Sequence, residues 1–230
     1  MMKTTKMMIA AILLCGTGLN AQAQNYYETK HEVAVAVGGP SNSEIVDVFS
    51  NMFSTVISAA VTSIMTGGNA AAYYTYGDWK DTPSISAEYF YHVNKTIGIG
   101  AVGAFTGMSR DMYITYTNLN NNETVKEKTG RAAKQFYTIM PTVKIDWLRK
   151  KNVGLYSKIG AGMTLIHETQ KDDEKSGMKG EKTDYSKNSV MFNFQVSAIG
   201  VEVGSPKFRG FAELGYGEQG IALIGLRYKF

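Results

Sequence analysis

Three histidines, His31, His92 and His167, are the side chains of this 230-residue chain best suited to proton transfer near neutral pH. A hydrolase would need one of them beside an activated serine. None stands two residues before a serine, and His167-Glu168-Thr169 is the nearest departure from that arrangement. The three also lie in separate segments, without the spacing of metal ligands. The sequence therefore predicts no catalytic residue, no metal site and no cofactor.

Cysteine and calcium chemistry are disfavoured as well. Cys15 is the only cysteine and lies in the N-terminal leader, so the mature chain has no thiol for a disulfide, a metal or a nucleophile. Asp172, Asp173 and Glu174 are consecutive, whereas a calcium loop needs acidic residues at alternate positions. The mixed charges around them predict a solvated surface loop.

The first 23 residues have the pattern of a secretory signal peptide. Two lysines precede an apolar run over 7–14 that is too short to span a bilayer. The small-residue site at Ala21 and Ala23 predicts cleavage before Gln24, which leaves 24–30 as a periplasmic N-terminal segment. A lipoprotein would use Cys15 as its first residue, but the bulky Leu14 before it disfavours this alternative. The leader carries two of the 24 basic residues and none of the 20 acidic residues, so the mature chain has a formal net charge of +2. A charge this close to neutral gives no reason to expect nucleic acid as a partner.

Most of the mature chain alternates apolar and polar residues with period two, which is typical of β-strands. In the sixth of these segments the alternation changes phase near Ile199 and Gly200, which predicts a β-bulge. The alternation of the third segment can be traced beyond residue 106 through Tyr113 and Tyr116, which suggests a longer strand. Eight strands are expected, over 31–38, 84–93, 97–106, 134–147, 153–166, 190–203, 209–217 and 221–230.

The connections between these segments indicate a membrane-spanning barrel. Short turns follow the second, fourth and sixth strands, while long polar connections follow the first, third and fifth, as in transmembrane barrels. Strands of this length can cross the hydrocarbon when tilted. Aromatic residues fall on the outward face near both strand ends, as a girdle requires. The expected fold is all-β, an eight-stranded antiparallel transmembrane β-barrel over 31–230 with an amphipathic helix in its first extracellular loop.

In this architecture the chain resembles the small outer-membrane barrel families, such as the OmpA transmembrane domain, OmpX, OmpW and related Bacteroidota barrels. Leu226, Tyr228 and the terminal Phe230 look like the C-terminal signal of those families. The resemblance implies an outer-membrane location, assembly by the outer-membrane assembly machinery, and contact with the bilayer and lipopolysaccharide.

Charged residues fall on the inward face of the predicted strands. An eight-stranded barrel leaves an interior that side chains fill, so charges there need partners. Arg227 on the last strand is expected to lie beside Glu213 on the preceding strand and Glu32 on the first. A structural ion-pair network is favoured over a gated pore. Its expected members are Glu32, Glu88, Lys144, Lys158, Glu202, Glu213 and Arg227, with Asp146 and Lys229 on the same face.

Residues 43–65 break the strand pattern and predict an amphipathic helix. Ser41 and Glu44 suggest a capping box before it, and Gly67-Gly68 a stop after it. The helix could cover the barrel mouth, lie on the membrane surface, bind a partner or pack on its own barrel, and the last is preferred. Its polar stripe disfavours a transmembrane helix. The aromatic segment after it, with Tyr73, Tyr74, Tyr76 and Trp79, could bind sugars or proteins or anchor at the interface.

The sequence thus predicts a non-enzymatic outer-membrane barrel with a structural or surface-interaction role. A narrow channel for small or apolar solutes is the alternative, and a lipid-modifying enzyme comes third. An extracellular partner would be reached through loops 41–82, 110–132 and 169–188, and no ligand is identified.

Overall fold

A computed structural model describes residues 29–77, 80–118, 123–172 and 184–230. The predicted signal peptide, with its cleavage site at Ala21, Ala23 and Gln24, lies outside the described residues. Trp79 and the centre of the predicted loop 169–188 lie outside them too.

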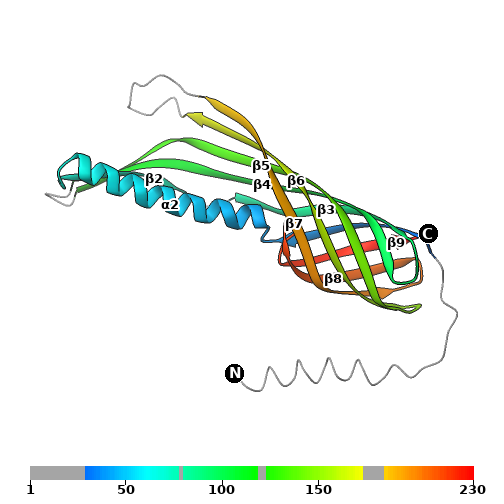
Figure 1. The fold of residues 1–230 in the computed structure, drawn as a ribbon. Coiled ribbons are helices and arrows are strands. Elements are labelled where there is room, and N and C mark those ends of the chain that lie inside the picture. Colours follow the sequence, from blue (N-terminus) through cyan, green and yellow to red (C-terminus); the bar gives the residue numbers. More distant parts are fainter. Residues whose placement is uncertain (1–28, 78–79, 119–122, 173–183) are drawn as a thin grey trace, which may run out of the picture.

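Eight strand positions close into a ring, which confirms the expected barrel (Figure 1). Neighbouring strands are antiparallel, β1 pairs with β9 across the seam between the chain ends, and the pairing of β4 with β5 completes the ring. The strands are β1 (His31–Gly39), β3 (Lys80–His92), β4 (Ile97–Asn118), β5 (Glu123–Arg149), β6 (Val153–Asp172), β7 (Tyr185–Gly204), β8 (Phe208–Gly217) and β9 (Ala222–Lys229).

One end of the barrel, here called the turn end, carries the short connections that follow β3, β5 and β7. At the other end, the extension end, β4 to β7 run well beyond the strands β1, β8 and β9 (Figure 1). β4 has 22 residues and β5 has 27, whereas β9 has 8.

The long loops predicted over 110–132 and 169–188 are therefore wrong in extent, and the continuation of the third strand through Tyr113 and Tyr116 is confirmed by β4. β4 and β5 form a hairpin that leaves only 119–122 between them, and β6 and β7 leave 173–184. Charged residues within 110–132 pair across the strands: Lys128 Nζ lies 3.1 Å from Asp111, and Lys126 lies over the Tyr113 ring. Cross-strand pairs of this kind stabilise exposed sheet without a buried face.

A strand that was not predicted, β2 (Ala70–Tyr76), lies within the expected loop 41–82. β2 pairs with the outer part of β4 from Asn118 to Met112, and β3 pairs with β4 from Ser109 onward. β2 and β3 thus lie end to end beside β4 and share one position in the ring. The ring therefore has eight positions although the described residues form nine strands.

The predicted helix is present as α2 (Asn42–Met65). Ser41 is its N-cap, and the capping box with Glu44 is formed as predicted. The bulge is confirmed too, because the register between β7 and β8 shifts between Ser197 and Ile199.

Candidate functional site

The interior of the barrel is packed with charge. None of the ten ionisable side chains named below is more than 6% exposed. They comprise five carboxylates and five bases, namely Glu32, Glu88, Asp146, Glu202 and Glu213 with Lys144, Lys158, Arg209, Arg227 and Lys229. Because isolated charges are costly in such surroundings, their mutual neutralisation is what makes this interior possible.

Arg227 lies at the centre of this network and contacts four carboxylates. Its closest partners are Glu202, 2.8 Å from Nη1, and Glu88, 3.2 Å from Nη2. The two partners expected from strand order, Glu32 and Glu213, lie farther away, at 3.6 Å and 3.8 Å. The short contacts therefore reach strands two positions away in the ring rather than the adjacent strands.

Two further clusters flank Arg227. Lys158 Nζ bridges Glu88 at 2.5 Å and Glu213 at 2.9 Å. Nearer the turn end, Lys144 Nζ lies 2.7 Å from Glu32, and Lys229 is ion-paired with Glu202. All seven residues predicted for the network thus meet in one connected set.

The sequence prediction of the charge network left out three members of this set. Arg209 donates to Glu202 at 2.6 Å and to the backbone carbonyls of Lys150 and Lys151. His92 lies between Glu32 and Asp146, with its ring nitrogens 3.2 Å and 3.3 Å from their carboxylates. Strand alternation places both side chains inside the barrel. It does not show which carboxylates such long side chains contact, so neither residue was included in the predicted network.

Tyr156 is the third, and it separates cations inside the lumen. Its hydroxyl donates to Glu213 at 2.7 Å, while the Lys144 ammonium and the Arg227 guanidinium lie 4.3 Å and 4.6 Å from its ring centre. Both contacts are of the cation–π type. Gly200 opposite is required for this packing, since a Cβ there would lie 2.4 Å from the Tyr156 ring.

At the extension end, the turn between β8 and β9 folds inward and caps the lumen. Gln219 donates to Glu88 at 2.8 Å and to Ser86 at 2.9 Å. Gly217 and Gly220 on either side have φ of 144° and 111°, values that favour glycine. The two glycines are the feature of the sequence that could have indicated an unusual turn here. The alternation of apolar and polar residues predicts strands, and it gives no information about the turns between them.

Glu218 in the same turn holds the start of α2. Its Oε2 accepts hydrogen bonds from the backbone N–H and hydroxyl of Ser43, at 3.2 Å and 2.7 Å, and from Asn193 at 2.6 Å. Burial raises the pKa of Glu218, and the hydrogen bonds from Ser43 and Asn193 oppose that rise. The helix N-terminus is thus fixed to the barrel mouth by a buried carboxyl group.

The polar stripe of α2 faces the protein and its apolar stripe faces outward. Asp47 lies 2.6 Å from Lys134 and 3.5 Å from Arg110, and the Thr62 hydroxyl donates to the carbonyl of Ala72 in β2. On the opposite side Phe49 and Phe53 are 68% and 70% exposed. The expected packing on the protein's own strands is present. The helix uses its polar face for this packing, whereas an amphipathic helix usually packs on a protein through its apolar face. α2 is long and apolar enough to cross a bilayer by length and composition alone.

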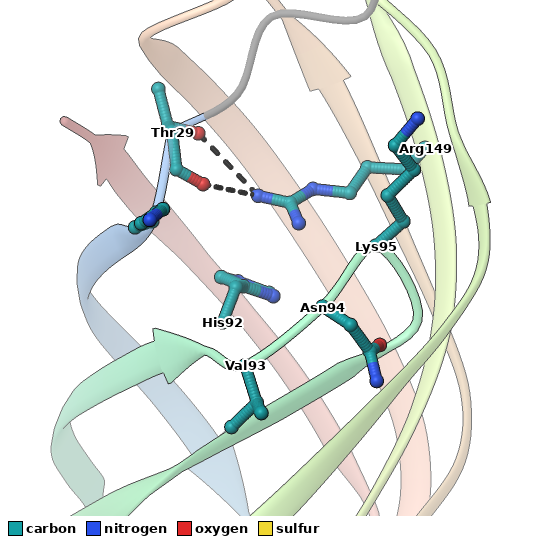
Figure 2. Close-up of a pocket in the computed structure, with 7 residues that line it drawn as sticks. Thr29, His92, Val93, Asn94, Lys95 and Arg149 are labelled. Atoms are coloured by element: carbon teal, nitrogen blue, oxygen red, sulfur yellow. Dashed lines mark hydrogen bonds between the residues drawn. The ribbon is translucent and has the colours of Figure 1, made fainter.

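A cavity of about 310 Å³ lies at the turn end of the barrel (Figure 2). Figure 2 shows Arg149 reaching toward Thr29, with His92 below this contact and Asn94 and Lys95 on the turn that follows β3. Arg149 Nη2 donates to the Thr29 carbonyl at 2.7 Å. Lys30 and Val93 complete the lining.

The remaining two histidines make structural contacts. His31 stacks on the Phe230 ring at 5.5 Å and shares a hydrogen bond with the Tyr89 hydroxyl. His167 is hydrogen-bonded to Asn188 at 2.6 Å. Among the described residues, no group of three His, Cys, Asp or Glu side chains could hold a metal ion.

Taken with the outer wall, this interior defines the class of protein. The large outward side chains of the barrel wall are apolar or aromatic, including Val35, Ile139 and Ile224, which are 59%, 65% and 68% exposed. The aromatic residues expected near both strand ends are exposed as well, at 71% for Trp147 and 69% for Phe192. A closed sheet with a charged inside and an apolar outside is the arrangement typical of transmembrane β-barrels.

No protein-family model matches the chain, and no curated protein sequence matches it. Among solved structures, the chain is similar to Ail, the attachment invasion locus protein of Yersinia pestis, at 13% identity and a TM-score of 0.40 over 89% of this chain and 100% of that one. It is also similar to Ail in complex with the heparin analogue sucrose octasulfate, at 15% identity and a TM-score of 0.39 over 87% and 99% of the two chains.

Proposed function

We propose that this protein is a non-enzymatic outer-membrane β-barrel whose lumen is plugged and whose extension end forms a platform for binding another protein outside the cell. The platform consists of α2, β2 and the outer parts of β4 and β5. On this proposal the turn end lies in the periplasm, as in other transmembrane barrels with short turns at one end.

The outward apolar face of α2 is the observation that carries the proposal. Its largest exposed members are Phe49, Met52, Phe53, Val56 and Ile64, each more than 60% exposed. The polar face of α2 packs on the strands, which leaves this apolar face exposed. Exposing a large apolar patch to water is unfavourable in free energy, and such a patch is typical of an interaction site. Phenylalanine and methionine are enriched in protein–protein interfaces, which favours a protein partner over a sugar.

The lumen supports an anchoring role rather than the alternative of a channel. Arg227, Lys158 and Lys144 bridge carboxylates from opposite walls, and Gln219 closes the extension end above them. An eight-stranded barrel is just wide enough for its side chains, so these contacts leave no wide water path.

Site-specific photo-crosslinking on intact cells tests the platform. A photoreactive residue at position 53, on the apolar face, is expected to give a crosslink to a second protein. The same residue at position 62 is the matched control, since Thr62 contacts β2 and should crosslink within the chain.

The location of the platform is tested separately with Phe53→Cys, because the mature chain is expected to contain no other cysteine. A membrane-impermeant maleimide should label this variant on intact cells. Labelling only after lysis would refute the outward orientation. Labelling on intact cells with equal crosslinking from positions 53 and 62 would instead refute the binding role of the apolar face.

A further inference from the structure

The cavity at the turn end is lined by basic and amide side chains. Lys30, Lys95 and Arg149 surround it, and Asn94 contributes an amide. None of the described residues that line it is acidic. Three cations around one opening create a positive potential that attracts an anion.

The donors of the cavity are fixed by contacts elsewhere in the turn end. Arg149 is held by the Thr29 carbonyl through Nη2, which orients the planar guanidinium across the opening (Figure 2). The side-chain oxygen of Asn94 accepts the backbone N–H groups of Thr96 and Ile97, both at 2.8 Å. The amide nitrogen of Asn94 is therefore the group that this side chain offers to a ligand.

The carboxylates beneath the cavity are neutralised within the lumen. Glu32 and Asp146 lie on either side of His92, which lines the cavity. Lys144 lies 2.7 Å from Glu32 and 3.6 Å from Asp146, and Lys229 also contacts Glu32. These acids therefore offset little of the positive charge at the opening.

The neighbouring turns have the same sign of charge. Lys150 and Lys151 follow β5, Lys207 precedes β8, and the turns at 93–96, 150–152 and 205–207 contain no acidic residue. Val93, which also lines the cavity, is 58% exposed on the outward side of the barrel. The cavity thus lies where the apolar wall ends and a membrane surface begins.

We propose that this cavity binds a phosphate-ester anion. A guanidinium suits the bidentate recognition of a tetrahedral oxyanion, lysine ammonium groups add charge, and the Asn94 amide adds a neutral donor. A volume of about 310 Å³ accommodates a phosphate with a short polar substituent. Two sources carry this chemistry, namely the headgroup of a phospholipid in the adjacent leaflet and a soluble phosphate ester.

Binding is measured on the full mature barrel by two routes. Glycerol 3-phosphate is titrated by calorimetry into protein in uncharged detergent, with sodium chloride of equal ionic strength as the blank. In the second route, native mass spectrometry counts phosphatidylglycerol molecules retained by protein released from nanodiscs. Arg149→Gln and Lys95→Gln are the test variants, and Lys207→Gln is the matched control because it removes an exposed lysine from another turn at the same end.

Wild type should bind in at least one route, and Arg149→Gln should weaken that binding by about tenfold or more. Lys95→Gln should weaken it too, while Lys207→Gln stays within about twofold of wild type, as expected for screened surface charge.

Binding of the soluble ester alone assigns the site to free phosphate esters, and retention of lipid alone assigns it to headgroups. Folding of each variant is checked by its unboiled gel band, so Lys95→Gln keeps the test valid if Arg149→Gln does not fold. No binding in either route, or equal loss in Lys207→Gln, overturns the proposal, and neither outcome bears on α2.

Discussion

The charged side chains of the lumen show how far alternation along a strand can predict a site. Alternation places a side chain inside or outside the barrel, and it placed Glu32, Glu213 and Arg227 inside as observed. It does not say which side chains meet across the lumen. Glu202 is closer to Arg227 than either neighbour expected from strand order. That preference depends on strand stagger and side-chain length, which a single strand pattern does not contain.

Replacing Arg227 by alanine tests whether these charges act as a network. The change removes a cation that contacts four buried carboxylates and leaves the lumen with more acids than bases, so the unfolding free energy should fall by about 3–5 kcal/mol, the usual cost of removing one partner from a buried ion pair. Denaturant midpoints for wild type and variant measure the loss. Wild type in planar bilayers should show little steady conductance.

The exposed Lys207 provides a matched substitution, since Lys207→Ala removes a cation outside the lumen. Its midpoint should lie close to that of wild type. A conducting wild type whose stability is unchanged by Arg227→Ala would instead show hydrated charges and favour the channel.

At the scale of elements, α2 was predicted in position and in both stripes, but not in orientation. A usual surface helix buries its apolar stripe, whereas α2 turns Asp47 and Thr62 toward the protein and Phe53 outward. The sequence holds no local signal for this choice. The deciding contacts are with Lys134, at the start of the predicted strand 134–147, and with Arg110, which lies beyond the predicted strand 97–106.

Asp47→Ala is expected to loosen the helix without unfolding the barrel. The substitution removes the ion pairs of Asp47 with Lys134 and Arg110, which join the first half of α2 to β5 and β4. Amide hydrogen exchange should speed up in α2 and β2, while β8 and β9 keep their protection.

Ser54→Ala is the control, because Ser54 is exposed and bonds only to a carbonyl of its own helix among the contacts seen. Exchange in β2 should not change in this variant. Uniform faster exchange through β9 in Asp47→Ala would show that the helix anchors the whole barrel instead.

For the whole molecule, the strand number, the antiparallel ring and the inside-out distribution of side chains could be predicted, because closure and bilayer thickness restrict the solutions. The extension was predicted only in part, through the continuation of the third strand to Tyr113 and Tyr116. Residues 110–118 and 123–132 are polar, and they form strands because β4 and β5 pair with each other and with β2 and β6.

Deleting Phe230 tests the end of the chain as an assembly signal. Its backbone exchanges two hydrogen bonds with His31, both 2.9 Å, and its ring stacks on His31 and Tyr228. Unfolded protein is expected to accumulate, measured as loss of the fast-migrating band in unboiled gels.

Phe230→Ala separates the two causes, since it keeps the backbone hydrogen bonds and removes only the ring. A defect in both variants assigns the effect to the aromatic ring. A normal folded band for the deletion would remove the case for a signal at this terminus.

The seam between β1 and β9 also divides the charge of the molecule by order of synthesis. The first two ring strands made, β1 and β3, bring Glu32 and Glu88 to the interior, and the last one, β9, brings Arg227 and Lys229. An open sheet with β1 and β9 as its two edges would carry acidic side chains at one edge and basic side chains at the other. Pairing β1 with β9 brings Arg227 within 3.6 Å of Glu32 and 3.2 Å of Glu88, so closure of the ring also pairs acidic residues of the first strands with a base of the last.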